Sequence, residues 1–334
     1  MRAKNVSLAA IIVFSILVTA SAPFFGIEKI GLRVLTDTGQ SVTSDIFWQI
    51  RLPRVISAFV AGATLALAGM AFQAYFRNPL ATPFTLGVSS GAAFGSALAI
   101  RMGLLFSFAG ITARSLSAFL WAMVAILIVY GLTRLRKGFS SATMLVAGVA
   151  VNFFFSSVIL FIQYISDFDN SFRMVRWMMG GFEIIGYDSL TAVLPFSLIG
   201  IAILAANMNE MNLLVLGEET ASSRGVDIRR ARISIFFSAS LMTGGVVSAF
   251  GPVGFVGMMA PHICRLMVGA DHRVLAPASL FFGGAFLVLC DTIARTLIAP
   301  AEIPVGVLTA LLGGPFFLWL LMKGFSESVS PAKR

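Results

Sequence analysis

The sequence predicts an all-α membrane protein, a single domain of about ten transmembrane helices over residues 1–334. The first observation is composition: 58% of the residues are hydrophobic and only 12% are charged, whereas soluble domains carry roughly 25% charged residues. The second is length. Apolar runs of about 20 residues, enough to cross a hydrocarbon core of roughly 30 Å, recur along the whole chain. A water-soluble fold could not bury that much apolar surface.

Polar breaks divide the apolar runs into ten expected spans, of which the third and the eighth are short and rich in glycine. In chain order the spans are expected near residues 6–25, 54–73, 84–100, 112–133, 142–165, 189–206, 231–250, 253–268, 275–295 and 305–323. The first run has an alternative interpretation as a cleavable signal peptide, because Arg2 and Lys4 precede it and Ala20-Ser21-Ala22 ends it. Its length favours a membrane span.

The distribution of Lys and Arg predicts the orientation, because basic loops resist translocation. If both termini are cytoplasmic, the whole formal excess of +9 lies on the cytoplasmic side and the outer segments are neutral overall. Two segments outside the membrane are long enough to fold locally, the outer residues 26–53 and the cytoplasmic residues 207–230.

Several classes of function lack the residues they need. The basic residues are scattered between spans and form no stripe, which excludes nucleic-acid binding. Cys264 and Cys290 lie in apolar runs, as small buried hydrophobic residues do. His262 and His272 lack the spacing and the neighbouring carboxylates of a metal or catalytic site. No Walker pattern is present, so we expect this chain to bind no metal and no cofactor.

Three arginines stand at the expected outer ends of spans: Arg51 and Arg54 in the segment RLPR, and Arg295. Two interpretations remain open, namely snorkelling to lipid headgroups and a basic outer ring that docks an acidic partner or attracts an anionic substrate. Asp291 is the one acidic residue well within a span. We expect it to serve helix packing, with Arg295 at position i+4 as its partner, and a proton relay is the alternative.

Two glycine-rich segments predict close helix packing. In LGVSSGAAFG the glycines recur every four residues on one helical stripe, where a neighbouring backbone can approach. In GPVGFVGMMAPH glycine and proline interrupt a span, and a broken helix in a membrane lines a cavity or packs on another helix. The residues of this packing and pathway set are Gly87, Gly91, Gly95, Gly251, Pro252, Gly254, Gly257 and Pro261.

The cytoplasmic stretch LGEETASSRGVDIRRAR predicts a short helix. Glu218 and Glu219 fall in its first turn and Gly225 is placed to end it. The stretch is either a solvated basic loop or a docking helix for a cytoplasmic protein.

Three long motifs resemble the FecCD type of importer permease, which serves iron chelates and cobalamin. They are RLPRVISAFVAGATLALAGMAFQAYFRNPLATPFTLGVSSGAAFG, GPVGFVGMMAPHICRLMVGADHRVLAPAS and AEIPVGVLTALLGGPFFLWLL, in the family's order, between about Phe47 and Met322. The resemblance implies the type II ABC importer permease fold in a bacterial or archaeal cytoplasmic membrane. It also implies a homodimer, two cytoplasmic ATP-binding subunits that carry ATP and Mg, and an external substrate-binding protein.

The resemblance also assigns residues. Arg51, Arg54 and Arg295 match arginines that look like sockets for acidic residues of the binding protein. The helix that couples the permease to the ATPase is matched by residues within the 207–230 loop. These coupling residues are Leu216, Gly217, Glu218, Glu219, Ala221, Arg224 and Gly225.

The expected function is ABC import of an iron–siderophore complex, or of haem or cobalamin, by alternating access. Since no residue is placed for covalent chemistry, we expect the permease itself not to be an enzyme. The alternative is a gradient-driven secondary transporter, against which stands the scarcity of ionisable residues within the spans.

Overall fold

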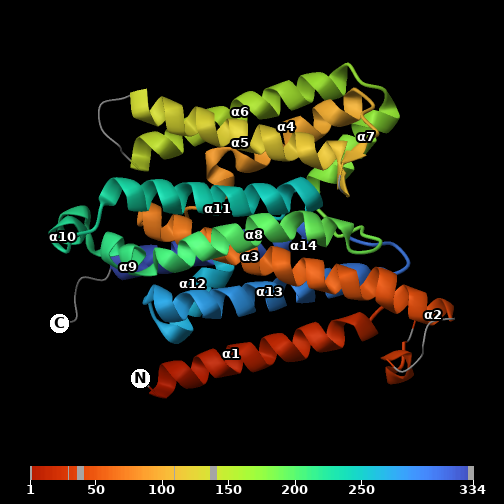
Figure 1. Ribbon diagram of the computed structural model, residues 1–334, viewed down its shortest axis with the longest axis horizontal. Coiled ribbons are helices and arrows are strands. Elements are labelled where there is room, and N and C mark those ends of the chain that lie inside the picture. Colours follow the sequence, from red (N-terminus) through yellow and green to blue (C-terminus); the bar gives the residue numbers. More distant parts are fainter. Residues whose placement is uncertain (1, 29, 36–40, 109, 136–140, 330–334) are drawn as a thin grey trace.

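The protein is a bundle of long helices that run along one common axis (Figure 1). The computed structural model describes residues 2–28, 30–35, 41–108, 110–135 and 141–329. The long helices are α1 (Arg2–Ser21), α3 (Leu52–Phe76), α4 (Val88–Arg101), α5 (Ala113–Leu135), α6 (Ser141–Tyr164), α8 (Asp188–Ala206), α11 (Ile228–Phe250), α12 (Val256–Val268), α13 (His272–Thr296) and α14 (Val305–Val329).

Short elements close the ends of the bundle. The short helices are η1 (Ala22–Phe24), η2 (Leu32–Leu35), α2 (Val42–Asp45), the π-helical turn η3 (Ile46–Arg51), η4 (Pro83–Leu86), α7 (Phe168–Met178), α9 (Met208–Leu216) and α10 (Glu218–Ser223). A two-stranded antiparallel hairpin, β1 (Ser107–Phe108) with β2 (Ile111–Thr112), joins α4 to α5.

Each of the ten ranges expected to span the membrane contains a helix. Seven helical segments within the described residues are long and apolar enough to cross a membrane: Lys4–Phe24, Val42–Phe76, Ala113–Leu135, Ala142–Tyr164, Asp188–Ala206, Ile228–Phe250 and His272–Thr296. The remaining three ranges contain α4, α12 and α14, whose apolar parts are shorter. The protein is therefore a multi-pass membrane protein, and the total of ten crossings stays a prediction.

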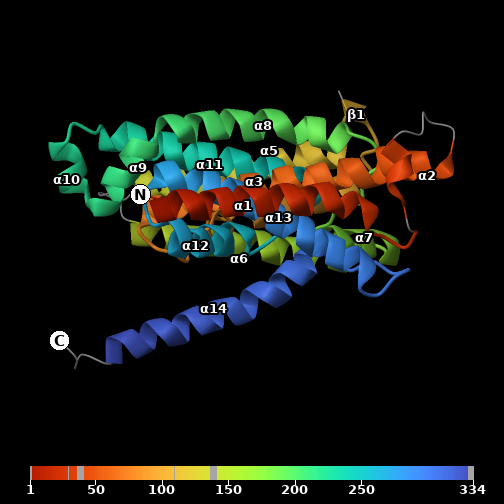
Figure 2. The same cartoon turned by 90° about the horizontal axis from the view of Figure 1, so that it is seen from below.

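The two ends of the bundle differ in what they carry. Helices α9 and α10, the start of α1 and the end of α14 lie at one end, which we call the inner end (Figures 1 and 2). Helices α2 and α7 lie at the opposite, outer end. The names follow the sidedness that the basic residues predict, and the cytoplasmic position of the 207–230 segment stays a prediction.

Helix α3 is the central helix, and almost all of its residues are buried. It packs closely because glycines face one another where helices cross. A Cβ atom at Gly62 would overlap the carbonyl oxygen of Gly283 in α13, and one at Gly69 would overlap that of Gly257 in α12. The backbones of α3, α12 and α13 can therefore approach one another more closely than larger side chains would permit.

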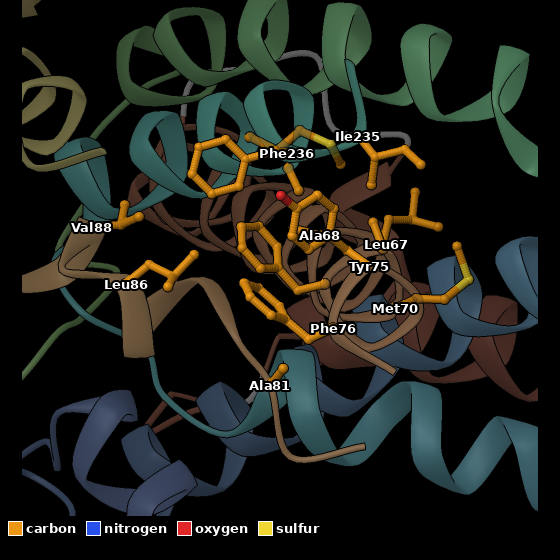
Figure 3. Close-up of a cluster of buried hydrophobic side chains, with 14 of the residues drawn as sticks. Leu67, Ala68, Met70, Tyr75, Phe76, Ala81, Leu86, Val88, Ile235 and Phe236 are labelled. Carbon is orange, nitrogen blue, oxygen red and sulfur yellow. The ribbon is translucent and has the colours of Figure 1, made fainter. Parts of the chain in front are cut away.

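An aromatic cluster fills the core towards the inner end of α3 (Figure 3). The rings of Tyr75 and Phe76 lie 4.7 Å apart between centroids, and Phe236 of α11 lies 5.9 Å from Tyr75. Phe72 stacks on Phe76 at 5.7 Å. These rings tie α3 to α11 by dispersion and by offset aromatic contacts.

Helices α4 to α7 form a layer on one side of α11 (Figure 1). The predicted glycine stripe lies within it: a Cβ at Gly91 would meet the carbonyl oxygen of Trp121 in α5, and one at Gly95 would meet that of Ser117. Gly87 takes a left-handed φ of 88° and lies against Val151 of α6. The stripe therefore serves close helix packing.

Helix α14 diverges from the rest of the bundle (Figure 2). Its apolar side chains are largely exposed, for example Leu311 at 64%, Leu318 at 62% and Met322 at 66%. Helix α6 is similar, with Phe153 at 71% and Phe154 at 62%. Apolar surface of this extent requires lipid or a second chain to cover it.

Candidate functional site

A buried ionic network joins α3, α13 and the loop before α14 at the outer end. Arg54 Nε lies 3.0 Å from each carboxylate oxygen of Asp291, and Arg54 Nη2 lies 2.9 Å from Asp291 Oδ1. Arg54 Nη1 donates to Glu302 Oε2 at 2.8 Å. Arg54 and Asp291 are 9% and 1% exposed, while the Glu302 side chain is 43% exposed. The arginine is thus held between one buried and one accessible carboxylate.

The other two outer arginines bind backbone carbonyl groups. Arg51 Nη2 donates to the carbonyl of Glu28 at 2.6 Å, and Arg51 Nη1 donates to that of Pro23 at 3.2 Å. Arg295 Nη2 donates to the carbonyl of Ala22 at 2.6 Å. These contacts anchor the segment after α1 to the outer ends of α3 and α13.

The surroundings of these residues differ in part from what the sequence indicated. Arg51, Arg54 and Arg295 were expected either to snorkel to lipid headgroups or to form a basic outer ring. In the structure they are 6%, 9% and 5% exposed and have partners within the chain. Asp291 pairs with Arg295 at 3.9 Å, as expected, but its shorter contacts go to Arg54, which the sequence did not indicate. The reason is geometric, because the two Arg54 nitrogens face the Asp291 carboxylate directly across the α3–α13 contact.

The sequence did not reveal Glu302 as a partner of Arg54. A lone acidic residue in a span signals that some cation lies nearby, because an unpaired buried charge is costly. However, the two carboxylates are 237 and 248 residues from Arg54 in the sequence. Only the fold brings them together.

The predicted helix break is present between α11 and α12. Gly251 and Phe255 take left-handed φ values of 74° and 66°. The exposed backbone is satisfied by neighbours, since the Gly181 N–H donates to the carbonyl of Phe250 at 2.9 Å. A Cβ at Gly180 or Gly306 would collide with the carbonyl oxygen of Pro252. The break therefore packs against the segment after α7 and the start of α14.

The other residues of the packing and pathway set differ in surroundings. Gly257 lies against Leu65 and Gly69 of α3, whereas nothing lies within 4 Å of a Cβ built on Gly254. Pro261 is buried inside α12. A role of the break in a translocation path stays a prediction.

Helix α10 projects beyond the bundle at the inner end (Figure 1). It runs from Glu218 to Ser223, and Gly217 before it and Gly225 after it take φ values of 128° and 82°. The predicted short helix is thus confirmed. Ala221 is buried, whereas Leu216, Glu219 and Arg224 are exposed. The seven expected coupling residues share this one projecting turn.

Glu218 links this helix to the core, which the sequence did not indicate. Its Oε1 atom accepts from Arg77 Nη2 at 3.4 Å and from Arg232 Nη2 at 2.5 Å. Arg77 follows α3 directly and has a left-handed φ of 49°, and Arg232 is in the first turns of α11. The Arg232 guanidinium also lies 5.7 Å from the ring centroid of Tyr75. One carboxylate therefore connects α10, α3 and α11.

Further polar contacts hold the inner ends of α12 and α13. Gln73 of α3 donates to the carbonyl of Met258 at 3.2 Å and accepts from Arg265 at 2.9 Å. His272 Nδ1 lies 2.7 Å from Asn212 Oδ1. Within the described ranges no three His, Cys, Asp or Glu side chains gather in a way that could hold a metal ion.

The comparisons with known proteins agree on one family. A sequence profile of the FecCD transport family matches residues 7–323. The hemin transport system permease of Yersinia pestis is 35% identical over 325 residues, which cover 95% of both chains. The cobalamin import permease of Halobacterium salinarum is 42% identical over 276 residues, 81% of this chain and 72% of that one. A metal-chelate type ABC transporter in an inward-facing conformation matches with a TM-score of 0.82 at 32% identity, covering 96% and 99%.

Proposed function

The chain belongs to the FecCD transport family and is a permease of an ABC importer, and from this premise we propose that it carries an iron–siderophore complex into the cytoplasm. Haem and cobalamin are the alternative cargoes, since relatives at 35% and 42% identity are named for them. Transport proceeds by alternating access of a path between two permease copies. The observation that supports ATP-driven transport, as distinct from the choice of cargo, is α10, a short projecting helix tied to the central helix α3 through Glu218.

ATP hydrolysis takes place on a separate subunit. In this family the permease is the membrane component, so we assign ATP and Mg to two cytoplasmic partners and no enzymatic activity or cofactor to this chain. The proposed contact with the ATPase is the exposed surface of α10 and its flanks, with Glu219 in the helix, Leu216 before it and Arg224 after it. A displacement of α10 reaches α3 and α11 through the Glu218 contacts with Arg77 and Arg232.

The second permease copy covers α14 and α6 in this proposal. Both helices expose large apolar side chains, among them Leu318, Trp319 and Phe153. An obligate dimer interface is apolar in the same manner, and lipid covers what the partner leaves exposed. The path between the copies would then be bounded by α14, whose start packs on the α11–α12 break.

The binding protein docks at the outer end and reaches Arg54 through Glu302. Arg54 itself is buried, and its accessible partner is the half-exposed Glu302 carboxylate. We assign docking to an exchange in which an acidic residue of the binding protein replaces Glu302 on Arg54. Such an exchange keeps the guanidinium paired at every stage, so it avoids an uncompensated buried charge.

Uptake of labelled cargo tests the proposal. Cells with and without this chain receive ferric siderophore, haem or cobalamin, each with an active or an inactivated partner ATPase. ATPase-dependent uptake of one cargo is the expected result. Uptake that survives loss of the ATPase and stops with an ionophore would instead support a gradient-driven transporter.

A further inference from the structure

The outer end contains a cavity that lies apart from the buried network of Arg54. Its volume is about 480 Å³, and it lies between the end of α4, the β1–β2 hairpin, the start of α5, and α7. Its lining residues are Ala99, Ile100, Arg101, Gly103, Leu104, Leu105, Phe106, Ser107, Thr112, Arg114, Asn170 and Arg173. The cavity thus combines three arginines with polar and with apolar side chains.

The three arginines come from three different elements: Arg101 ends α4, Arg114 begins α5, and Arg173 lies in α7. None of them makes a salt bridge with a carboxylate of the described chain, in contrast to Arg54 and Arg176. Three cations around one cavity repel one another, and a shared anion would relieve that repulsion.

The nearby carboxylates do not neutralise this group. The Glu183 carboxylate attracts Arg114 electrostatically, but it already forms a salt bridge with Arg176 at 2.6 Å. The Asn170 N–H, with a smaller contribution from Arg101, lowers the pKa of Asp167, which therefore stays charged and balances one arginine at most. Asp169 in the first turn of α7 and Asp188 beside Gly110 of the hairpin also lie in this region, but neither makes a salt bridge with the three arginines in the described part of the chain.

The rim of the cavity is strongly apolar. Leu105 is 93% exposed, Phe106 is 55% exposed and the adjacent Met102 is 64% exposed. Helix α7 also exposes Phe168 at 83% and Phe172 at 56%, outside the lining of the cavity. A helix with apolar side chains on one face and arginines on another is typical of one that lies in the membrane interface. The surroundings therefore suit an amphiphile with an anionic head.

We propose that this cavity binds the phosphate of an anionic phospholipid from the outer leaflet. Arg101, Arg114 and Arg173 hold the phosphate oxygens, because guanidinium groups form paired, charge-assisted hydrogen bonds with phosphate. Leu105 and Phe106 lie along the acyl chains. The inference goes beyond the proposed transport function and does not depend on which cargo is carried.

The same arginines also reach towards the break between α11 and α12. Arg114 and Arg173 line a second, smaller cavity of about 160 Å³, together with Gly180, Gly181 and Phe250. Two of them contact the α11–α12 break: Gly180 lies against the carbonyl of Pro252, and the Gly181 N–H donates to that of Phe250. A lipid bound to Arg114 and Arg173 would therefore lie next to the segment that packs against the break.

The test measures lipid retention by the full chain purified with its ATPase. The complex is reconstituted in nanodiscs that contain phosphatidylglycerol or only phosphatidylcholine, released in mild detergent, and weighed by native mass spectrometry. The variant is R114Q/R173Q, and R230Q, which removes one exposed cation from the first turn of α11 at the inner end, is the control. Loss of two charge-assisted contacts should lower phosphatidylglycerol retention about tenfold or more, while R230Q retains it like the parent chain.

The outcomes separate the possible occupants. Equal retention by all three proteins, or equal retention of phosphatidylcholine by the parent chain, would overturn the proposal. Displacement of phosphatidylglycerol by millimolar inorganic phosphate would identify a free anion site and overturn it as well. A variant that keeps its lipid but no longer captures the binding protein would assign the cavity to an acidic protein surface. If R114Q/R173Q does not fold, R114K/R173K keeps the charge and should retain part of the lipid.

Discussion

The two ends of α3 are both held by ionic contacts, but in opposite environments. At the outer end Arg54 is 9% exposed and Asp291 is 1% exposed. At the inner end the side chains of Arg77 and Glu218 are 40% and 48% exposed. A buried pair cannot be broken without leaving an unpaired charge, whereas an exposed pair exchanges its partner for water at little cost. The pair of Arg54 and Asp291 should therefore persist through a transport cycle, whereas the pair of Arg77 and Glu218 can break during it.

Packing along the rest of α3 fits its central position in the bundle. Its middle is fixed by glycine contacts with α12 and α13, and its inner end carries the aromatic cluster. A displacement of α10 therefore acts on a helix that its neighbours hold rigidly. The following changes test that contrast, beginning with the one expected to have the largest effect.

Removal of the buried carboxylate should be the most damaging change. D291A leaves the guanidinium of Arg54 without its buried partner, and breaking one side of a buried pair costs about 3–5 kcal/mol. We expect the purified complex to unfold at a much lower temperature, measured by the melting of its helical circular dichroism in detergent.

A double variant distinguishes the loss of one charge from the loss of the whole ion pair. R54M/D291L removes both charges and fills similar volume, so most of the lost stability should return. A D291A protein as stable as the parent chain would mean that the buried pair of Arg54 and Asp291 does not stabilise the outer end.

The glycine contacts in the middle of α3 should be nearly as sensitive. A methyl group at Gly69 would overlap the carbonyl of Gly257, and overpacking of a close contact costs about 1–3 kcal/mol. G69A should therefore lower the melting temperature of the complex. The matched control is G131A in α5, where nothing lies within 4 Å of the added methyl group. If both variants melt alike, α3 and α12 are not in tight contact.

Glu302 tests the accessible side of the outer network. In E302Q the Asp291 contacts of Arg54 remain, and a half-exposed partner contributes at most about 1 kcal/mol, so the melting temperature should barely change. Loss of the competing charge should tighten binding of the substrate-binding protein severalfold, measured by surface plasmon resonance at two salt concentrations. Weaker binding would contradict the proposed exchange, and D188N, at the start of α8 on the same side, is the charge-matched control.

The overall fold could be predicted from composition and spacing, because apolar runs report helices directly. The short helix after Gly217 and the break after Phe250 were also readable, since glycine and proline act on the local backbone. Both signals lie within one segment of the chain. They do not depend on how the helices are packed.

The polar contacts could not be read in this way. The sequence predicted that Arg54 and Arg295 lie at one end of the bundle, opposite α10, but it could not show that Asp291 and Glu302 would enclose Arg54. Their burial is a product of packing between α3 and α13, which are far apart in the sequence. The partners of Glu218 were hidden for the same reason, because Arg77 precedes it by 141 residues.

The inner contact should have the smallest effect on stability and a clear effect on coupling. Glu218 is half exposed, and the amide oxygen of E218Q can still accept from Arg232, whose side chain is 11% exposed, so the variant should cost only about 1 kcal/mol of unfolding free energy. The variant loses the charge that joins Arg77 to Arg232, so α10 can move without moving α3. We expect ATP hydrolysis in proteoliposomes to continue while the cargo transported per ATP falls severalfold.

The neighbouring residue provides the control for this last change. Glu219 is exposed in the same helix and makes no salt bridge with a residue in the described part of the chain, so E219Q removes the same charge without opening the contact with α3. If E219Q and E218Q reduce transport per ATP equally, the effect belongs to the ATPase surface. If only E218Q does, the inner end of α3 is the link through which α10 acts, and the exposed contact is the one that moves.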